Sequence, residues 1–144
     1  MWEAGTGSEL LTLRGHQDYV WSIAWSPDGS KLATACGDRT AKVWKVVSGA
    51  ELVSLRGHQD SVQNIAWSPD GSKLATASDD RTAKVWEAST GRELLTVRGQ
   101  AGRGARCGTQ HVDLALSLLD EQAGFSNDAF HSSDRHHRDW MLGR

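Results

Sequence analysis

A string of thirteen residues, IAWSPDGSKLATA, occurs twice in this chain, at 23–35 and again at 65–77. Both copies lie within longer repeats, because 15–56 aligns with 57–98 at a shift of 42 residues and 29 of the 42 aligned positions are identical. A period of this length is typical of proteins built from stacked supersecondary units, each of which buries its apolar faces against its neighbours. The repeat therefore constrains the fold more than any other feature of the chain.

Each repeat predicts four short β-strands. In the first repeat, the apolar segment VWSIAW is followed by SPDGS, in which Pro27 restricts φ and Gly29 can adopt the positive φ of a tight turn. The segments KLATA, TAKVW and LVSLR follow as further strands, separated by the turn segments GDRT and SGAE. The second repeat has the same order, so the sequence predicts two sets of four antiparallel strands.

These segments resemble WD40 repeats, in which a Gly-His pair precedes a V-x-x-I-A-W-S-P-D-G strand and turn, and a later strand ends in Trp. The Gly-His pairs stand at 15–16 and 57–58, Trp44 and Trp86 end the third strands, and the resemblance covers residues 2–98. The residue after each Trp departs from the family pattern, because it is Lys or Glu rather than Asp. The resemblance implies an all-β fold of two four-stranded antiparallel propeller blades, a partial propeller, with an irregular or short-helical C-terminal tail.

The resemblance also implies a hydrogen-bonded network of four residues in each blade. A buried imidazole needs partners for both ring nitrogens, and a buried indole N–H needs an acceptor. A chain that runs from a carboxylate to His, Thr and Trp pairs all of these groups, and such a buried network is costly to break. The resemblance places these structural tetrads at His16, Thr34, Asp38 and Trp44, and at His58, Thr76, Asp80 and Trp86.

The Asp, His and Thr residues of each repeat also invite comparison with a catalytic triad. A catalytic set is expected once in a chain and its hydroxyl has to reach solvent, whereas this set occurs in both repeats and Thr34 is predicted within a strand. The chain has neither a phosphate-binding glycine loop nor a nucleophile motif. We therefore expect no catalytic residue, no cofactor and no metal site, and a protein that is not an enzyme.

The differences between the two repeats are clustered, and five of them flank the entry to the first strand and the link between the second and third strands. In propellers of this family, the end of the blade that carries these five positions lies near the face that usually binds partners. Protein interfaces favour aromatic side chains. The alternative is neutral divergence, with Trp21 packed in the core. The candidate partner-binding residues are Tyr19, Trp21, Ser61, Gln63, Asn64 and Asp79.

The function that the resemblance implies is a non-catalytic scaffold for protein–protein interaction, as a fragment of a longer propeller. Two alternatives stay open. One is a regulatory or sensing repeat array of a larger signalling enzyme whose catalytic domain lies outside this chain. The other is a truncated or frame-shifted gene product without function.

Residues 1–14 predict the outer strand of an incomplete blade, ahead of the two repeats at 15–56 and 57–98. The segment WEAGTGSELLTLR, which begins at residue 2, matches WEASTGRELLTVR at 86–98 at 10 of 13 positions, and predicts a strand at 9–13. Two blades leave strand edges and faces without partners. A head-to-tail homo-oligomer of three or four chains would complete a ring.

The repeat pattern stops at Gln100, which stands where the next repeat would have His. Residues 99–144 contain no Lys and no Pro but four of the six His, and 111–124 predicts a short helix. The cluster HSSDRHHRD at 131–139 is only a weak metal-binding signal. We expect a tail that is poorly ordered and either a genuine appended segment or the product of a truncated array.

Charge and composition argue against several other classes of protein. The chain has 16 basic and 18 acidic residues, so no attraction to nucleic acid is expected. No apolar run approaches the roughly 20 residues of a membrane span, and the N-terminus does not read as a signal peptide. Two cysteines, Cys36 and Cys107, are too few for a disulfide framework. We expect other proteins as partners and a cytoplasmic location.

Overall fold

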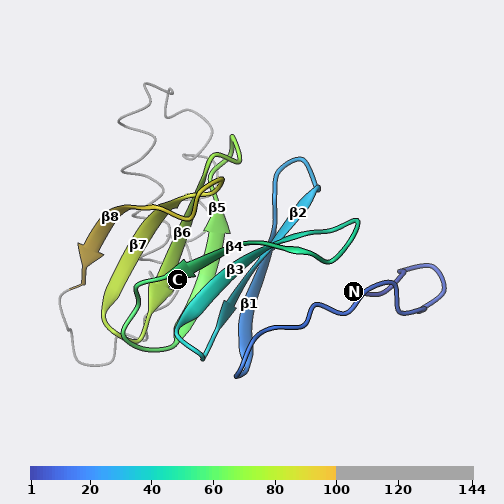
Figure 1. Ribbon diagram of the computed structural model, residues 1–144, viewed down its shortest axis with the longest axis horizontal. Helices are drawn as coiled ribbons and strands as arrows, with labels where there is room; N and C mark the ends of the chain where they lie inside the picture. The colour runs from blue at the N-terminus through green and yellow to red at the C-terminus, as the bar shows by residue number, and fades with distance from the viewer. Residues whose placement is uncertain (100–144) are drawn as a thin grey trace, which may run out of the picture.

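The computed structural model describes residues 1–99, which form two four-stranded antiparallel sheets (Figure 1). The first blade has the strand order β1-β2-β3-β4, and the second blade has the order β5-β6-β7-β8. The prediction of two four-stranded blades is confirmed. The tail, with the helix predicted at 111–124, lies outside the described residues. The strands are β1 (Val20–Trp25), β2 (Lys31–Cys36), β3 (Thr40–Lys45), β4 (Glu51–Arg56), β5 (Val62–Trp67), β6 (Lys73–Ser78), β7 (Thr82–Glu87) and β8 (Glu93–Arg98).

The turn between β1 and β2 is held by its own side chains. The Asp28 carboxylate accepts hydrogen bonds from the Ser26 hydroxyl at 2.7 Å and from the Ser30 backbone N–H at 3.0 Å. Gly29 has a φ of 72°, a left-handed conformation that costs glycine little. The same bonds recur at Asp70 in the second blade. Asp28 and Asp70 therefore stabilise the turns, and the hydrogen bonds that hold each turn come from residues within the turn itself.

The core lies between the two blades, where β5 contacts β1 and β2. The facing side of the first blade is lined mainly by small residues, and the second blade places larger side chains against them. Burial of apolar side chains of this size is the main source of stability for such a stack. The cluster contains Ala33, Ala35, Ala41, Val43 and Leu55 of the first blade with Val62, Ile65, Leu74, Trp86 and Ala88 of the second.

The opposite side of β1 is exposed, and we call Val20, Ile23 and Trp25 the first-blade flank. Ile23 is 60% exposed, whereas the equivalent Ile65 in β5 is 3% exposed; the corresponding values are 46% for Val20 and 0% for Val62. β1 and β5 are both edge strands of their sheets, but β5 packs on one side of the first blade, whereas no strand of another blade within residues 1–99 covers the exposed side of β1 (Figure 1). The apolar positions through which β5 packs on the first blade are therefore exposed in β1, where no described residue covers them.

Residues 1–14 do not contain the regular strand that was predicted at 9–13. A single bridge joins Trp2 to Glu9, and it reproduces the pairing of Trp44 with Glu51 at the end of the β3–β4 hairpin. The segment thus forms the tip of a hairpin but not its length, because no strand among residues 1–99 pairs with residues 10–13. Leu11 nevertheless contacts Gly49 as Val53 contacts Gly91, so the segment lies where the outer strand of a preceding blade would lie.

The hydroxyl of Ser54 in β4 is buried without a hydrogen-bond partner among the described residues. Its counterpart in β8, Thr96, accepts a hydrogen bond from the Lys84 ammonium at 2.9 Å. A buried hydroxyl that lacks a partner destabilises the folded state. We expect Ser54→Ala to raise the free energy of unfolding by about 1 kcal/mol in a urea titration. A clear loss of stability would mean that the hydroxyl has a partner in solution.

Candidate functional site

In the second blade, four side chains from four different elements form one hydrogen-bonded chain. His58 Nδ1 lies 2.8 Å from Asp80 Oδ2, and His58 Nε2 lies 2.8 Å from Thr76 Oγ1. The Trp86 indole N–H donates to the same Thr76 oxygen at 2.8 Å. A carboxylate can only accept, so Nδ1 carries the imidazole proton and the Thr76 hydroxyl donates to Nε2.

The first blade repeats this tetrad. His16 Nδ1 lies 3.0 Å from Asp38 Oδ2, and His16 Nε2 lies 2.7 Å from Thr34 Oγ1, which accepts the Trp44 indole N–H at 2.9 Å. The His precedes the first strand, Thr is in the second, Asp follows it, and Trp is in the third. The structure therefore brings together all eight residues that the sequence proposed for the two tetrads, and each tetrad ties two strands, the link between them and the entry segment into one blade.

The acidic member of each tetrad has more partners than the sequence analysis assigned to it. Asp80 also accepts hydrogen bonds from the Gln59 backbone N–H at 2.9 Å and from the Thr82 hydroxyl at 2.6 Å. Burial opposes ionisation of Asp80, but the bonds from Thr82, Gln59 and His58 outweigh it and lower its pKa to about 2. The repeated D-R-T spacing was the signal for this additional Thr. Asp38 has the corresponding bonds, and its pKa is also lowered.

The tetrad of the second blade predicts a loss of stability in acid. Burial lowers the pKa of His58 below its ordinary value of 6.5, so below that pH the unfolded chain binds a proton that the folded chain does not. Asp80, with a pKa lowered from 3.8 to about 2, adds a second loss as the pH falls below about 4. The pKa values of His58 and Asp80 are both lowered in the folded chain, so both groups make it less stable as the pH falls. We expect the urea midpoint to fall from pH 7.5 to pH 5 and further towards pH 3, and a midpoint that is constant over this range would contradict the assignment.

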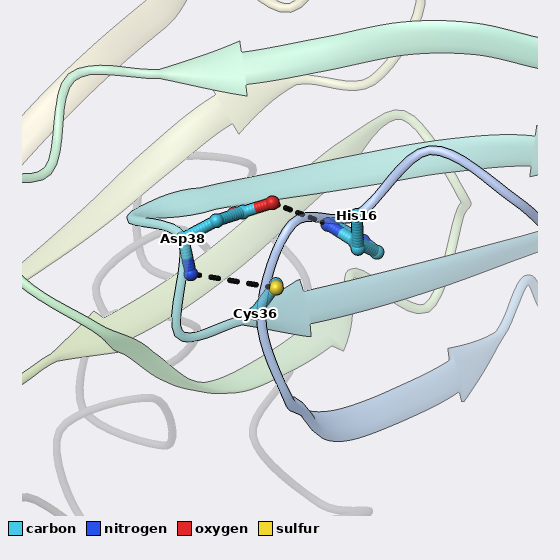
Figure 2. A group of neighbouring side chains, drawn as sticks. All are labelled: His16, Cys36 and Asp38. Carbon is cyan, nitrogen blue, oxygen red and sulfur yellow. Dashed lines mark hydrogen bonds and ion pairs between the residues drawn. The ribbon is translucent and has the colours of Figure 1, made fainter.

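Cys36 lies beside the first tetrad, and its sulfur, His16 and Asp38 form a group whose donor atoms all lie within 4.8 Å of one another (Figure 2). Every one of these atoms has a hydrogen-bond partner: the Cys36 thiol donates to the Asp18 carbonyl at 3.2 Å and accepts from the Asp38 N–H at 3.4 Å. Burial raises the pKa of this thiol, which disfavours the thiolate that binds metals. Ser78 makes the same two bonds in the second blade. We therefore interpret Cys36 as a structural residue.

Two of the candidate partner-binding residues form an exposed aromatic pair. Tyr19 is 76% exposed and Trp21 is 55% exposed, and their ring centroids are 6.0 Å apart at an angle of 49°. The alternative interpretation of Trp21 as a core residue is therefore wrong. A Cβ at Gly37 would lie 2.9 Å from the Asp18 carboxylate and 3.2 Å from the Trp21 indole nitrogen. Glycine at this position allows both groups to lie against the link between β2 and β3.

The four candidates of the second blade are in different surroundings. Asn64 accepts a hydrogen bond from the Ser22 hydroxyl at 3.1 Å, and the Ser61 hydroxyl donates to the Gly37 carbonyl at 3.4 Å, so both contact the first blade. The Gln63 amide donates to the exposed Asp79 carboxylate at 2.7 Å. At this end of the molecule, the polar groups of the second blade therefore pair with one another or with the first blade, whereas the first blade exposes aromatic rings.

Comparison with known families agrees with this geometry. The family model described as "WD domain, G-beta repeat" matches residues 7–45 and 49–87, which together are more than half of the chain. The chain belongs to the WD40-repeat family. Domains of this family generally act as non-enzymatic scaffolds that bind other proteins.

The WD40 repeats are similar to parts of much longer proteins. Mouse Coronin-7 is 54% identical over 43 residues, which are 30% of this chain and 5% of that protein. A probable cytosolic iron-sulfur protein assembly protein CIAO1 homolog from Chlamydomonas reinhardtii is 52% identical over 31 residues, which are 22% of this chain and 9% of that protein. The chain therefore matches only a small part of the length of these relatives.

Solved structures show the same relation between this chain and longer WD40 proteins. A structure of U3-55K superposes with a TM-score of 0.59 at 32% identity and covers 61% of this chain and 29% of that chain. A crystal structure of RRP9 WD40 repeats gives the same TM-score and identity, and the match covers 61% of this chain and 28% of the RRP9 chain. Among residues 1–99, the structure contains no helix that is long and apolar enough to cross a membrane.

Proposed function

We propose that this chain is a non-catalytic WD40 scaffold that binds other proteins at the end of the blades where Tyr19 and Trp21 lie. The exposed aromatic pair is the observation that supports this site. Large exposed aromatic side chains are favoured anchors in protein interfaces, because they bury much apolar area with few rotamers to order. The second blade has Ser61 and Gln63 at the equivalent positions, so this surface is specific to the first blade.

The tetrads support a structural role rather than a catalytic one. Thr76 is fully buried and His58 is 7% exposed, so substrate has no access to the hydroxyl or the imidazole of the second blade. The same set recurs with the same bonds in the first blade. A nucleophile needs an open path to a reacting atom, and the tetrads instead use their polar groups to satisfy one another.

The proposed binding site can be tested by exchanging the differing residues between the blades. The variant Tyr19→Ser/Trp21→Gln gives the first blade the residues that the second blade already carries, so the fold is expected to persist. Proteins captured on the immobilised chain are identified, and one of them is purified and titrated. We expect about a tenfold or greater loss of affinity in the variant. A control variant, Val47→Ala, removes an exposed apolar side chain elsewhere. Equal affinity of the wild-type chain, Tyr19→Ser/Trp21→Gln and Val47→Ala for the captured protein would contradict the proposed site.

We also propose that a second copy of this chain covers the first-blade flank. The flank residues Ile23 and Trp25 correspond to Ile65 and Trp67, which the structure shows seated on the first blade, with the Trp67 indole N–H donating to the Ala24 carbonyl at 3.1 Å. The small residues that receive them recur on the second blade as Ala75, Ala77, Ala83 and Val85. A copy placed head to tail would therefore repeat the contact that already joins the blades.

These four small residues are already buried in the single chain. Their surroundings therefore have to rearrange before a second copy can pack against them. Association is therefore expected to be slow and to increase with concentration. Sedimentation velocity of the wild-type chain should show species larger than one chain, which Ile23→Glu should remove and Val47→Glu should not. A wild-type chain that sediments as a single chain at every concentration would rule out this assembly.

A further inference from the structure

We infer that the aromatic pair and Asp18 bind an arginine side chain of the partner protein. The inference rests on the proposed function, since it names the chemistry that the same surface recognises. Three groups lie together at this point: the Tyr19 ring, the Trp21 ring and the Asp18 carboxylate, with Gly37 beneath the last two. Aromatic faces and a carboxylate are the groups that attract a guanidinium, by cation–π contact and by charge-assisted hydrogen bonds.

The Asp18 carboxylate is only partly satisfied within the chain. One of its oxygens accepts the Tyr19 backbone N–H at 2.7 Å. The other lies beside Gly37, as the Trp21 indole nitrogen does, and no hydrogen bond or ion pair to it is present among residues 1–99. An exposed carboxylate that is fixed by its neighbours is well placed to bind a cation, because little side-chain entropy is lost on binding.

The second blade shows what the same position looks like when it is internally satisfied. There Asp79 stands in place of Gly37 and Gln63 in place of Trp21, and the amide donates to the carboxylate at 2.7 Å. Ser61 replaces Tyr19, so no aromatic face is present. The first blade has two exposed rings where the second blade has this polar pair, and the strand pairing around the position is the same in both blades.

The nearest cation on the same link, Arg39, does not occupy the site. Among the described residues, Arg39 forms no ion pair with Asp18 and no ring contact with Tyr19 or Trp21, although it is exposed. Its backbone has a φ of 71°. A guanidinium from a partner is favoured over an ammonium, because its planar group stacks on a ring while its N–H groups reach a carboxylate.

The inference can be tested by NMR titration of the full chain, following the indole N–H of Trp21, which is assigned by its absence in Trp21→Gln. The probes are two capped peptides of the same glycine-rich sequence, one with arginine and one with citrulline, which has the same shape without the charge. We expect the arginine peptide to shift this resonance with about tenfold higher affinity than the citrulline peptide. Asp18→Asn should weaken the arginine peptide about fivefold, whereas Asp60→Asn in the second blade should not.

The outcomes separate this inference from the proposed function. If both peptides shift the Trp21 resonance equally, or if Asp18→Asn has no effect, the surface binds without regard to charge; the arginine inference then fails and the scaffold proposal stands. If no peptide shifts the resonance, the arginine inference also fails. If a captured partner binds Tyr19→Ser/Trp21→Gln as tightly as the wild-type chain, the proposed binding site itself is wrong.

Discussion

Asp80→Ala is expected to lower the free energy of unfolding by about 3 kcal/mol, whereas Asp79→Ala, one residue earlier, should change it by about 0.5 kcal/mol. The Asp80 carboxylate accepts bonds from the His58 ring, from two backbone N–H groups and from the Thr82 hydroxyl. Without it, buried donors lose their acceptor. Asp79 is exposed, and its carboxylate has a hydrogen bond only from Gln63 among the described residues. Urea titrations of the two variants measure the difference.

A second substitution distinguishes the tetrad from a general effect of lost charge. Asp80→Asn keeps the shape of the side chain, but its NH₂ group cannot accept hydrogen bonds from the donors that face it. The Asp80→Asn variant should therefore be clearly less stable than the wild-type chain at neutral pH. It should also lose less stability than the wild-type chain as the pH falls below 4. If Asp80→Ala and Asp79→Ala melt alike, the tetrad does not hold the second blade together.

Ile65→Ala is expected to cost about 2–4 kcal/mol of stability, whereas Ile23→Ala should cost less than about 1 kcal/mol in dilute solution. Both isoleucines stand at the start of the same thirteen-residue string. Ile65 is packed in the core between the blades, and its removal leaves a cavity. Ile23 projects from the exposed side of β1, where little contact is lost. Urea titrations at low protein concentration measure both values.

Protein concentration adds a readout to this pair of variants. If a second copy covers the first-blade flank, the cost of Ile23→Ala should grow as the chain is concentrated, because binding to the folded state adds stability. The cost of Ile65→Ala should not depend on assembly in the same way. Equal costs for both variants in dilute solution would show that the flank is already covered in the single chain.

The strands, turns and tetrads of the two blades follow from short segments of sequence. The SPDGS turns are stabilised by hydrogen bonds between residues only two to five positions apart. The members of each tetrad are joined by spacings that recur at a shift of 42 residues, so the pattern could be read without knowledge of the packing. The additional partners of Asp38 and Asp80 were less visible: the D-R-T spacing marks Thr40 and Thr82, but a backbone N–H group carries no sequence pattern of its own.

The role of the residues that differ between the blades could not be read in this way. The sequence proposed Asn64 and Ser61 as partner-binding residues, and the structure shows them in contact with the first blade. Their environment depends on how two sheets that are distant in sequence face each other. The exposure of Trp21 depends in the same way on the absence of a side chain at Gly37 and on the path of β1.

By itself, the sequence determined what each segment prefers: which residues form strands, where the chain turns, and which polar groups can satisfy one another inside a blade. Only the tertiary structure decided which of the equivalent surfaces are covered. ELLTLR at 9–14 and ELLTVR at 93–98 differ at one position, yet only the second forms a ladder, because β7 lies beside it. Ile23 and Ile65 begin identical strings and differ in exposure from 60% to 3%. A strand needs a neighbour for its backbone, and an apolar face needs one for its side chains; neither neighbour is specified within the segment itself.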